Sequence, residues 1–269
     1  MSMSPKYLIV AFSLLPFLLN AQNDTLKVIH WQARAMYGMN IPLNAVEVGE
    51  PSDELIEYSD NSDYIHLGAT LFLDRERTWG LDGIIQLQSH KVGEKSYADF
   101  RRSVNEKYES DYYILQNTIG QGEDEEDESS PGNFGNVNKF YIGASYHHRE
   151  GKFRFTPRFM VGLVQVESKN AEINLKRKNS NEITEVTYFS SKPDRPHFSV
   201  LMGPTVGYQL VKNLMIYAEF YYSYMHANFN YTIKERNVYT ESTTETSTDH
   251  PNNVHAFNAG IGLILDLSY

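Results

Sequence analysis

Eight segments of the chain alternate between apolar and polar side chains with a period of two. This period is typical of β-strands, because successive side chains of a strand point to opposite faces. In each segment one face stays apolar over a length that suits a membrane-crossing strand. The segments are 29–40, 63–74, 79–91, 137–149, 152–167, 197–211, 213–233 and 254–269. Eight such strands in one chain predict an all-β barrel or sandwich.

The connections between these segments alternate in length. The short ones are 74–78, 148–152 and 211–213. The long, polar ones are 41–62, 92–136, 168–196 and 234–253. Short turns at one end and long loops at the other are typical of an antiparallel transmembrane β-barrel, whose short turns face the periplasm. An even number of strands also places both ends of the chain on the periplasmic side.

Two further stretches have strand character inside the predicted outer loops. Residues 171–189 alternate on both sides of Asn179-Ser180-Asn181, which predicts a hairpin. Residues 111–119 predict another strand, which we place in the loop region because it would break the short-long rhythm. If these strands belonged to the barrel, its strand number would be ten instead of eight.

The polar face of the eight segments indicates which way the barrel is turned. A soluble barrel, such as a lipocalin-like one, would expose lysine and glutamate there, whereas this face is rich in glycine and other small residues. Examples are Gly38, Gly68, Gly143, Ser145, Gly162, Gly203, Gly207, Gly260 and Gly262. Small residues fit the narrow interior of a small barrel. The apolar face is therefore predicted to contact lipid, with aromatic residues such as Trp31, Trp79 and Tyr269 near the interfaces.

Charged residues of both signs lie on the predicted lumen face. They are Arg34, Asp82, Arg154, Arg158, Glu219 and Asp266. Charges inside a barrel must pair or hydrate, because an isolated buried charge is very costly. We interpret them as a structural ion-pair network that fills the lumen, since eight strands leave room only for side chains. A gate or a narrow pore is the alternative.

The N-terminus and the composition limit where the protein works. Lys6, the apolar run that follows it and a small residue at Ala21 predict a secretory signal peptide over 1–21, which leaves a barrel domain over 22–269. The absence of cysteine excludes disulfides and a lipid-anchored cysteine. The formal net charge of −10 argues against nucleic acid as a partner.

The last segment has the most specific pattern. Its apolar face is Ile261, Leu263, Leu265, Leu267 and the final aromatic Tyr269. In this the chain resembles the small outer-membrane β-barrel proteins of Gram-negative bacteria, in particular a barrel-domain family common in Bacteroidota. The resemblance implies an integral outer-membrane location among outer-membrane lipids and lipopolysaccharide. It also implies that the barrel-assembly machinery reads this strand as an assembly signal.

Three groups of residues are candidate sites. The acidic run 122–133 lacks the spacing of a calcium loop and is interpreted as a solvated loop. His197-Phe198-Ser199 resembles the His-x-Ser of outer-membrane lipid A deacylases, but both polar residues fall on the lumen face instead of the lipid face. His147, His148, His226, His250 and His255 are too scattered for a metal site. We therefore expect no catalytic residue, metal or cofactor.

The sequence thus predicts an eight-stranded outer-membrane barrel without catalytic activity. Its long outer segments favour a structural, adhesive or partner-binding role, with an extracellular protein or another surface ligand as the partner. A lipid A-modifying hydrolase and a small-solute channel are the alternatives.

Overall fold

A computed structural model describes residues 30–44, 61–91, 102–119, 133–166, 171–190 and 196–267. The predicted signal peptide at 1–21, the acidic residues 122–132 and Tyr269 lie outside the described residues.

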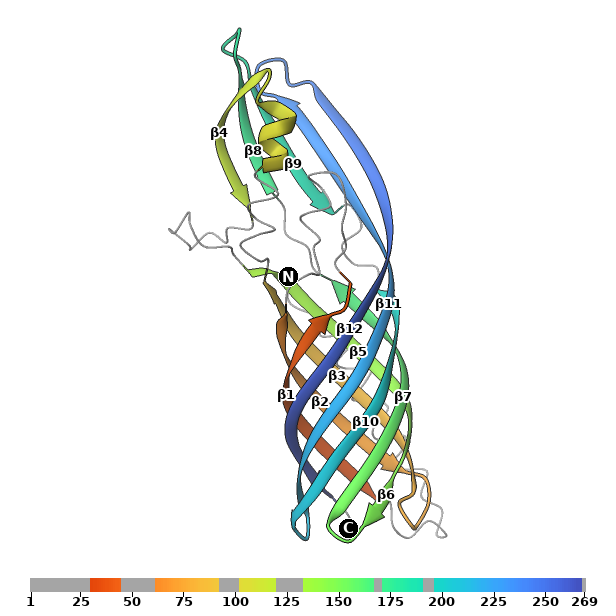
Figure 1. Ribbon diagram of the computed structural model, residues 1–269. Coiled ribbons are helices and arrows are strands. Elements are labelled where there is room, and N and C mark those ends of the chain that lie inside the picture. Colours follow the sequence, from red (N-terminus) through yellow and green to blue (C-terminus); the bar gives the residue numbers. More distant parts are fainter. Residues whose placement is uncertain are drawn as a thin grey trace.

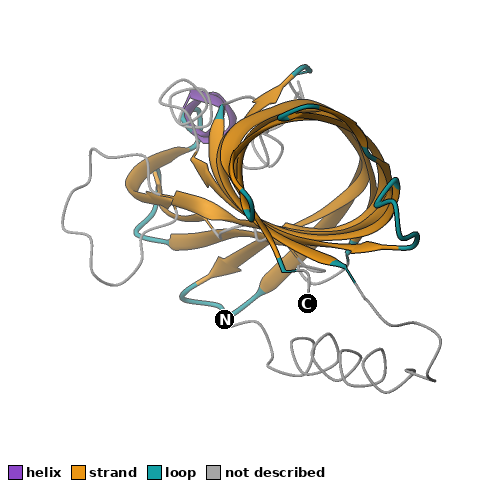
Figure 2. Ribbon diagram, turned by 90° about the horizontal axis from the view of Figure 1, so that it is seen from below, coloured by secondary structure: helices purple, strands orange, loops and turns teal. Residues whose placement is uncertain are grey.

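Eight strands form a closed antiparallel barrel (Figures 1 and 2). They are β1 (Trp31–Pro42), β2 (Ser62–Phe72), β3 (Trp79–Lys91), β5 (Asn133–Tyr146), β7 (Phe153–Val166), β10 (His197–Val211), β11 (Leu214–Asn237) and β12 (Thr243–Asp266). The ring closes because β10 pairs with β7 on one side and with β11 on the other. This confirms the predicted barrel and its eight strands.

The three short turns lie at one end of the barrel, which is the periplasmic end in outer-membrane barrels. In the turn after β2, the Asp74 carboxylate accepts hydrogen bonds from the backbone N–H groups of Thr78 and Trp79, at 3.0 and 2.8 Å. Burial raises the pKa of Asp74, but these hydrogen bonds together outweigh it and hold the pKa below its ordinary value. In the next turn, the short strand β6 (His148–Glu150) pairs back onto β7.

Side-chain exposure follows the predicted parity. On β7, Phe153, Phe155 and Phe159 are exposed, whereas Arg154 and Arg158 are buried. A closed barrel leaves no unpaired backbone in contact with lipid, and an apolar outer face needs lipid as its solvent. The protein is therefore an integral β-barrel of the outer membrane. Among the described residues, no helix is both long enough and apolar enough to span a bilayer.

Strands β11 and β12 extend far beyond the barrel. They pair without a register shift from Leu214–Leu265 at the periplasmic end to Arg236–Thr243 at the other end. Each has 24 residues, which at about 3.3 Å per residue is a length of roughly 80 Å. The prediction of a polar loop over 234–253 was therefore wrong. Polar side chains exclude a strand from lipid, but they do not exclude it from water, where a neighbouring strand can satisfy its backbone.

Three shorter strands join this extension to form what we call the outer sheet, in the order β12–β11–β9–β8–β4 (Figure 1). They are β4 (Tyr112–Ile119), β8 (Ala171–Arg177) and β9 (Ile183–Ser190). This confirms the hairpin predicted within 171–189, and it places the strand predicted over 111–119 outside the barrel.

The outer sheet has a packed core that continues the barrel interior. A helix over 102–108 lies against one face of the sheet and buries Val104 and Tyr108 there. These two side chains belong to the same apolar cluster as Leu175 of the sheet and Tyr141 and Leu201 of the barrel. The sheet is therefore held by side-chain packing as well as by backbone pairing.

Candidate functional site

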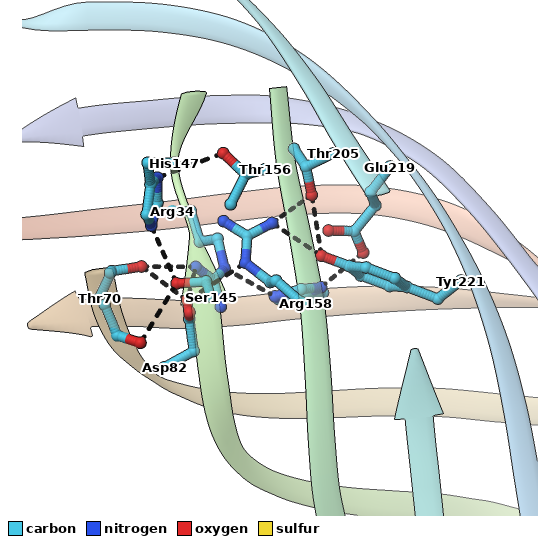
Figure 3. Close-up of polar contacts among 12 residues, drawn as sticks. Arg34, Thr70, Asp82, Ser145, His147, Thr156, Arg158, Thr205, Glu219 and Tyr221 are labelled. Atoms are coloured by element: carbon cyan, nitrogen blue, oxygen red, sulfur yellow. Dashed lines mark hydrogen bonds and ion pairs between the residues drawn. The ribbon is translucent and has the colours of Figure 1, made fainter. Parts of the chain in front are cut away.

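The middle of the lumen contains a group of charged side chains from four strands (Figure 3). Asp82 of β3 accepts hydrogen bonds from both Arg34 of β1 and Arg158 of β7 through its Oδ1 atom. The distance from Arg158 Nε to Asp82 Oδ1 is 3.3 Å, and Thr70 Oγ1 donates to the same oxygen at 2.7 Å. One carboxylate thus joins two buried guanidinium groups.

Two further residues connect Glu219 of β11 to this group. Arg34 Nε lies 3.3 Å from His66 Nε2, and His66 Nδ1 lies 2.8 Å from Glu219 Oε1. We call Arg34, His66, Asp82, Arg158 and Glu219 the central network. Two arginines face two carboxylates in it, so with a neutral histidine the formal charges balance. A buried charge is tolerated when it is paired in this way.

Neutral polar groups and tyrosines fill the space around the central network. Arg158 Nη1 donates to the Tyr221 hydroxyl at 2.8 Å, and Thr205 also contacts Arg158. Tyr64, Tyr141 and Tyr217 are almost fully buried in the lumen as well. Side chains therefore occupy the interior at this level, which is what the diameter of an eight-stranded barrel allows. The arrangement can brace the wall of the barrel.

Arg154 and Asp266, two of the six charges predicted for the lumen network, lie apart from the central network. Asp266 Oδ2 pairs with Arg77 Nη1 at 2.6 Å, near the periplasmic turns. Arg154 is buried, and neither its Nε nor its Nη1 atom has a hydrogen-bond partner in the described part of the chain. The six residues therefore separate into a paired group in the middle and a second group at the periplasmic end.

Sequence reasoning missed His66 and Arg77. His66 lies on the same face of its strand as Gly68, which we had assigned to the lumen, so the parity could have revealed it. Arg77 lies in a turn, where no periodicity indicates a direction. It adopts a left-handed backbone conformation with φ of 61°, which is uncommon for a residue with a side chain.

His197 and Ser199 lie on β10 at the outer end of the barrel. Ser199 is buried, and its hydroxyl donates to the Tyr224 carbonyl at 2.7 Å and lies 3.0 Å from the Tyr141 hydroxyl. A nucleophilic serine needs its hydroxyl proton directed at a base. In Ser199 that proton is directed at a backbone carbonyl.

The remaining candidate histidines make separate contacts. His147 is buried, with Nε2 at 2.9 Å from Ser145 Oγ, whereas the neighbouring His148 is exposed. His226 bonds to Asn253, and His255 bonds to Tyr222. His250 lies on β12. Within the described ranges, no group of three or more metal-ligating side chains comes together.

The apolar face of the last strand points outward, as its pattern predicts. Ile261, Leu263, Leu265 and Leu267 are all exposed on the barrel surface. Tyr269 lies outside the described residues. That the assembly machinery reads this strand stays a prediction.

The outer sheet offers two strand edges as candidate binding surfaces. The pairing of β12 with β1 ends at Ala256, so in the described part of the chain the residues from Thr243 to Asn252 pair with β11 alone. At the other side of the sheet, β4 pairs only with β8 among the described strands, and it exposes Tyr113 and Leu115.

No family model and no curated protein sequence matches this chain. Among solved structures, it is similar to a major outer membrane protein from Thermus thermophilus, at 11% identity over 89% of this chain and 99% of that one, with a TM-score of 0.43. It is also similar to Neisserial surface protein A, at 9% identity over 88% of this chain and 96% of that one, with a TM-score of 0.40. Likenesses of this strength carry no information on function, and membership of the Bacteroidota barrel family stays a prediction.

Proposed function

We propose that the protein is a surface-exposed binding protein, in which the barrel is the anchor and the outer sheet captures an extracellular protein. The observation that supports this most strongly is the outer sheet itself, whose helix-covered core continues the packed interior of the barrel. A chain that needed only to span the membrane would require strands of about ten residues. The additional length of β11 and β12 instead builds a surface.

The free edge of β12 is suited to binding an extended polypeptide. Unpaired backbone N–H and C=O groups along an edge strand can add a further strand from a partner. All the side chains from Thr243 to Asp249 are exposed and polar, so this edge is water-soluble without a partner. Pro251 interrupts its row of N–H groups, as is common at sheet edges. The carboxylate of Glu245, which lies 3.7 Å from Lys234 Nζ, favours a partner segment that is neutral or basic.

The β4 edge adds apolar contacts. Tyr113 and Leu115 are more than half exposed, at 58% and 55%. Large side chains of this kind are typical anchors in protein interfaces. The register shift between Ile114 and Gln116 sets Leu115 out of the regular pairing with β8. Together the two edges give the sheet one polar and one partly apolar docking strip.

The lumen and β10 favour this proposal over the alternatives. The side chains around the central network occupy the space that a solute would need, which argues against a channel. The Ser199 hydroxyl bonds to a backbone carbonyl, which argues against a hydrolase that uses His197 and Ser199.

The proposal is tested by shortening the hairpin without changing the barrel. Residues 232–247 are replaced by Asn-Gly, which joins Tyr231 to its cross-strand partner Thr248 in register. Cells that display either form are applied to surfaces coated with reduced, carboxamidomethylated albumin, whose chain is extended, or with native albumin. We expect the full-length protein to retain cells on the unfolded coating only, and retention to fall at least tenfold for the shortened form.

Two tyrosines provide a matched pair of variants that distinguishes binding at the β4 edge from non-specific adhesion. Tyr113 lies on the β4 edge, whereas Tyr239 lies at the hairpin tip, and both are exposed. If the β4 edge binds, Tyr113→Ser reduces retention and Tyr239→Ser does not. Equal retention by the full-length and shortened forms, with both barrels showing heat-modifiable gel mobility, would contradict the proposal.

A further inference from the structure

The periplasmic end of the barrel contains an open cavity of about 500 Å³. It lies between the ends of β1, β7, β10, β11 and β12, at the lower end of the barrel in Figure 1. Four cationic side chains and one carboxylate line it, namely Arg77, Arg149, Arg154, Lys212 and Asp266. The rest of the wall includes the neutral Gln32 and the apolar Met215 and Ile264. The cavity is therefore strongly basic, whereas the central network is balanced.

Arg154 is the residue that most clearly lacks a partner. Its side chain lines the cavity and it is only 7% exposed, yet its Nε and Nη1 atoms have no hydrogen-bond partner in the described part of the chain. Single buried atoms of other residues also have no hydrogen-bond partner in the described part of the chain, but none of these residues lines this cavity; they are Arg34, Tyr64, Asp82, Gln88, Tyr217 and Glu219. Buried N–H donors of a guanidinium group are unfavourable unless water or a ligand supplies an acceptor, and a charged ligand supplies the stronger one.

The register of the sheet places a second cation, and no acceptor, beside Arg154. Arg149 of β6 is paired directly with Arg154 of β7, so two like charges face each other across strands, which is normally destabilising. The neighbour of Arg154 on the other side is Gly207, which has no side chain to offer an acceptor. Arg149 itself donates to Gln209 Oε1 and to the Gly151 carbonyl at 3.3 Å, so it too finds only neutral acceptors.

Asp266 does not fully neutralise this pair. Its Oδ2 atom accepts from Arg77 Nη1 at 2.6 Å, and Arg77 Nη2 also lies 2.7 Å from His30 Nδ1. The one carboxylate of the cavity thus already pairs with a third arginine. Arg149, Arg154 and Lys212 remain as cations without a hydrogen-bonded carboxylate among the described residues that line the cavity.

We propose that this cavity is a binding site for a periplasmic oxyanion, a phosphate or carboxylate group, held between Arg149 and Arg154. Guanidinium groups bind both kinds of oxyanion through paired, charge-assisted hydrogen bonds. The volume lies within the range of small-molecule sites, so the anion can be part of a larger molecule. The apolar patch of Met215 and Ile264 would contact the remainder of that molecule.

Calorimetric titration of the detergent-folded protein with inorganic phosphate tests the proposal, with chloride of matched ionic strength as the blank. A second titration with succinate distinguishes a phosphate source from a carboxylate source. We expect saturable binding of at least one of the two, and a loss of at least tenfold in affinity for Arg154→Gln. The exposed Arg149→Gln, which does not disturb the lumen, should lose affinity several-fold.

Two controls keep the proposal falsifiable. Asp266→Asn removes the competing carboxylate and should tighten binding, whereas Arg177→Gln, an exposed arginine of the outer sheet, should leave affinity unchanged. Heat-modifiable gel mobility verifies that each variant is folded. Absence of saturable binding of both anions, or an affinity of folded Arg154→Gln and Arg149→Gln that equals that of the native protein, would overturn the proposal.

Discussion

Strand β11 crosses two environments without a break, and its two halves are built in opposite ways. In the barrel half, Ile216 and Phe220 face outward and Glu219 faces the lumen. In the outer half, Lys234 and Arg236 lie on the outward face and pair with acidic residues of the adjacent strands, while Ile233 packs into the core below the helix. The outward face of the strand is therefore apolar in the first half and charged in the second.

The difference teaches that alternation and orientation are separate pieces of information. Alternation fixes which residues share a face, and it holds along the whole strand. The residue types on the outward face then report the solvent, which is lipid for Ile216 and Phe220 and water for Lys234 and Arg236. The inward-facing side chains are determined by packing, because a narrow closed barrel and a helix-covered sheet both require a filled interior.

Removing the central carboxylate should have the largest effect on the barrel half. Asp82→Asn leaves Arg34 and Arg158 buried around a neutral amide, which we expect to cost about 3–5 kcal/mol in free energy of unfolding. Urea unfolding of the protein folded into lipid vesicles measures this. The matching change in the outer half is Glu245→Gln, which breaks an exposed pair with Lys234 at 3.7 Å and should cost about 0–1 kcal/mol. Equal costs would remove the distinction between the two halves.

Most of the barrel could be predicted from the sequence, and the outer sheet only in part. Each barrel strand has a long apolar face, because lipid demands one, and that face sets its parity and its approximate ends. The outer part of β12 is Thr243–Asn253, whose side chains are almost all polar, so no apolar periodicity distinguishes it from a loop. It is a strand because β11 continues beside it, and such pairing is a tertiary effect that propensity does not encode.

The lumen charges show a similar limit. Parity correctly assigned Arg34, Asp82, Arg158 and Glu219 to the interior, but their partners depend on strand order and stagger. Asp82 of β3 meets Arg34 of β1 across β2 and Arg158 of β7 across β5, which follows from the curvature of the closed barrel and not from spacing in the sequence. Arg77, on a turn, could not be placed by periodicity at all.

A substitution that creates a cavity in the core of the outer sheet tests whether the outer half unfolds independently of the barrel. Leu175 is fully buried in the core shared with the helix, and Leu175→Ala should cost about 2–5 kcal/mol. We expect faster amide hydrogen exchange in β8 and β9 and unchanged exchange in β1 and β2. Glu172→Ala, at an exposed position of the same strand, is the control. An equal increase of amide exchange in β1 and β2 would show that the two halves unfold as one unit.

A charge at an exposed position of each half of β12 should separate the two solvents directly. Ile261→Arg places a guanidinium against lipid, which is expected to cost about 2–4 kcal/mol near the bilayer midplane. Thr246→Arg puts the same group on the exposed part of β12, where the cost should be within about 0.5 kcal/mol. Unfolding in vesicles of both variants provides the measurement. A cost for Thr246→Arg as large as that for Ile261→Arg would mean that the outer half also contacts lipid.

The smallest predicted effect concerns a polar link inside the outer half. The Tyr108 hydroxyl donates to Glu235 Oε1 at 3.1 Å and lies 3.4 Å from the Tyr188 hydroxyl, so Tyr108→Phe should cost about 0.5–1.5 kcal/mol at neutral pH.

The same contacts make the link sensitive to alkali. Burial, Tyr188 and Glu235 all raise the pKa of Tyr108 above its ordinary value. Above about pH 10 the unfolded chain loses this proton while the folded chain keeps it, so the stability of the outer sheet falls as pH rises. In the native protein, we expect the melting temperature of the sheet, followed by near-UV circular dichroism, to be lower at about pH 11 than at about pH 8. In Tyr108→Phe the alkaline loss should be smaller, because the group that keeps its proton is gone. If Tyr108→Phe loses as much stability in alkali as the native protein does, the effect belongs to another residue.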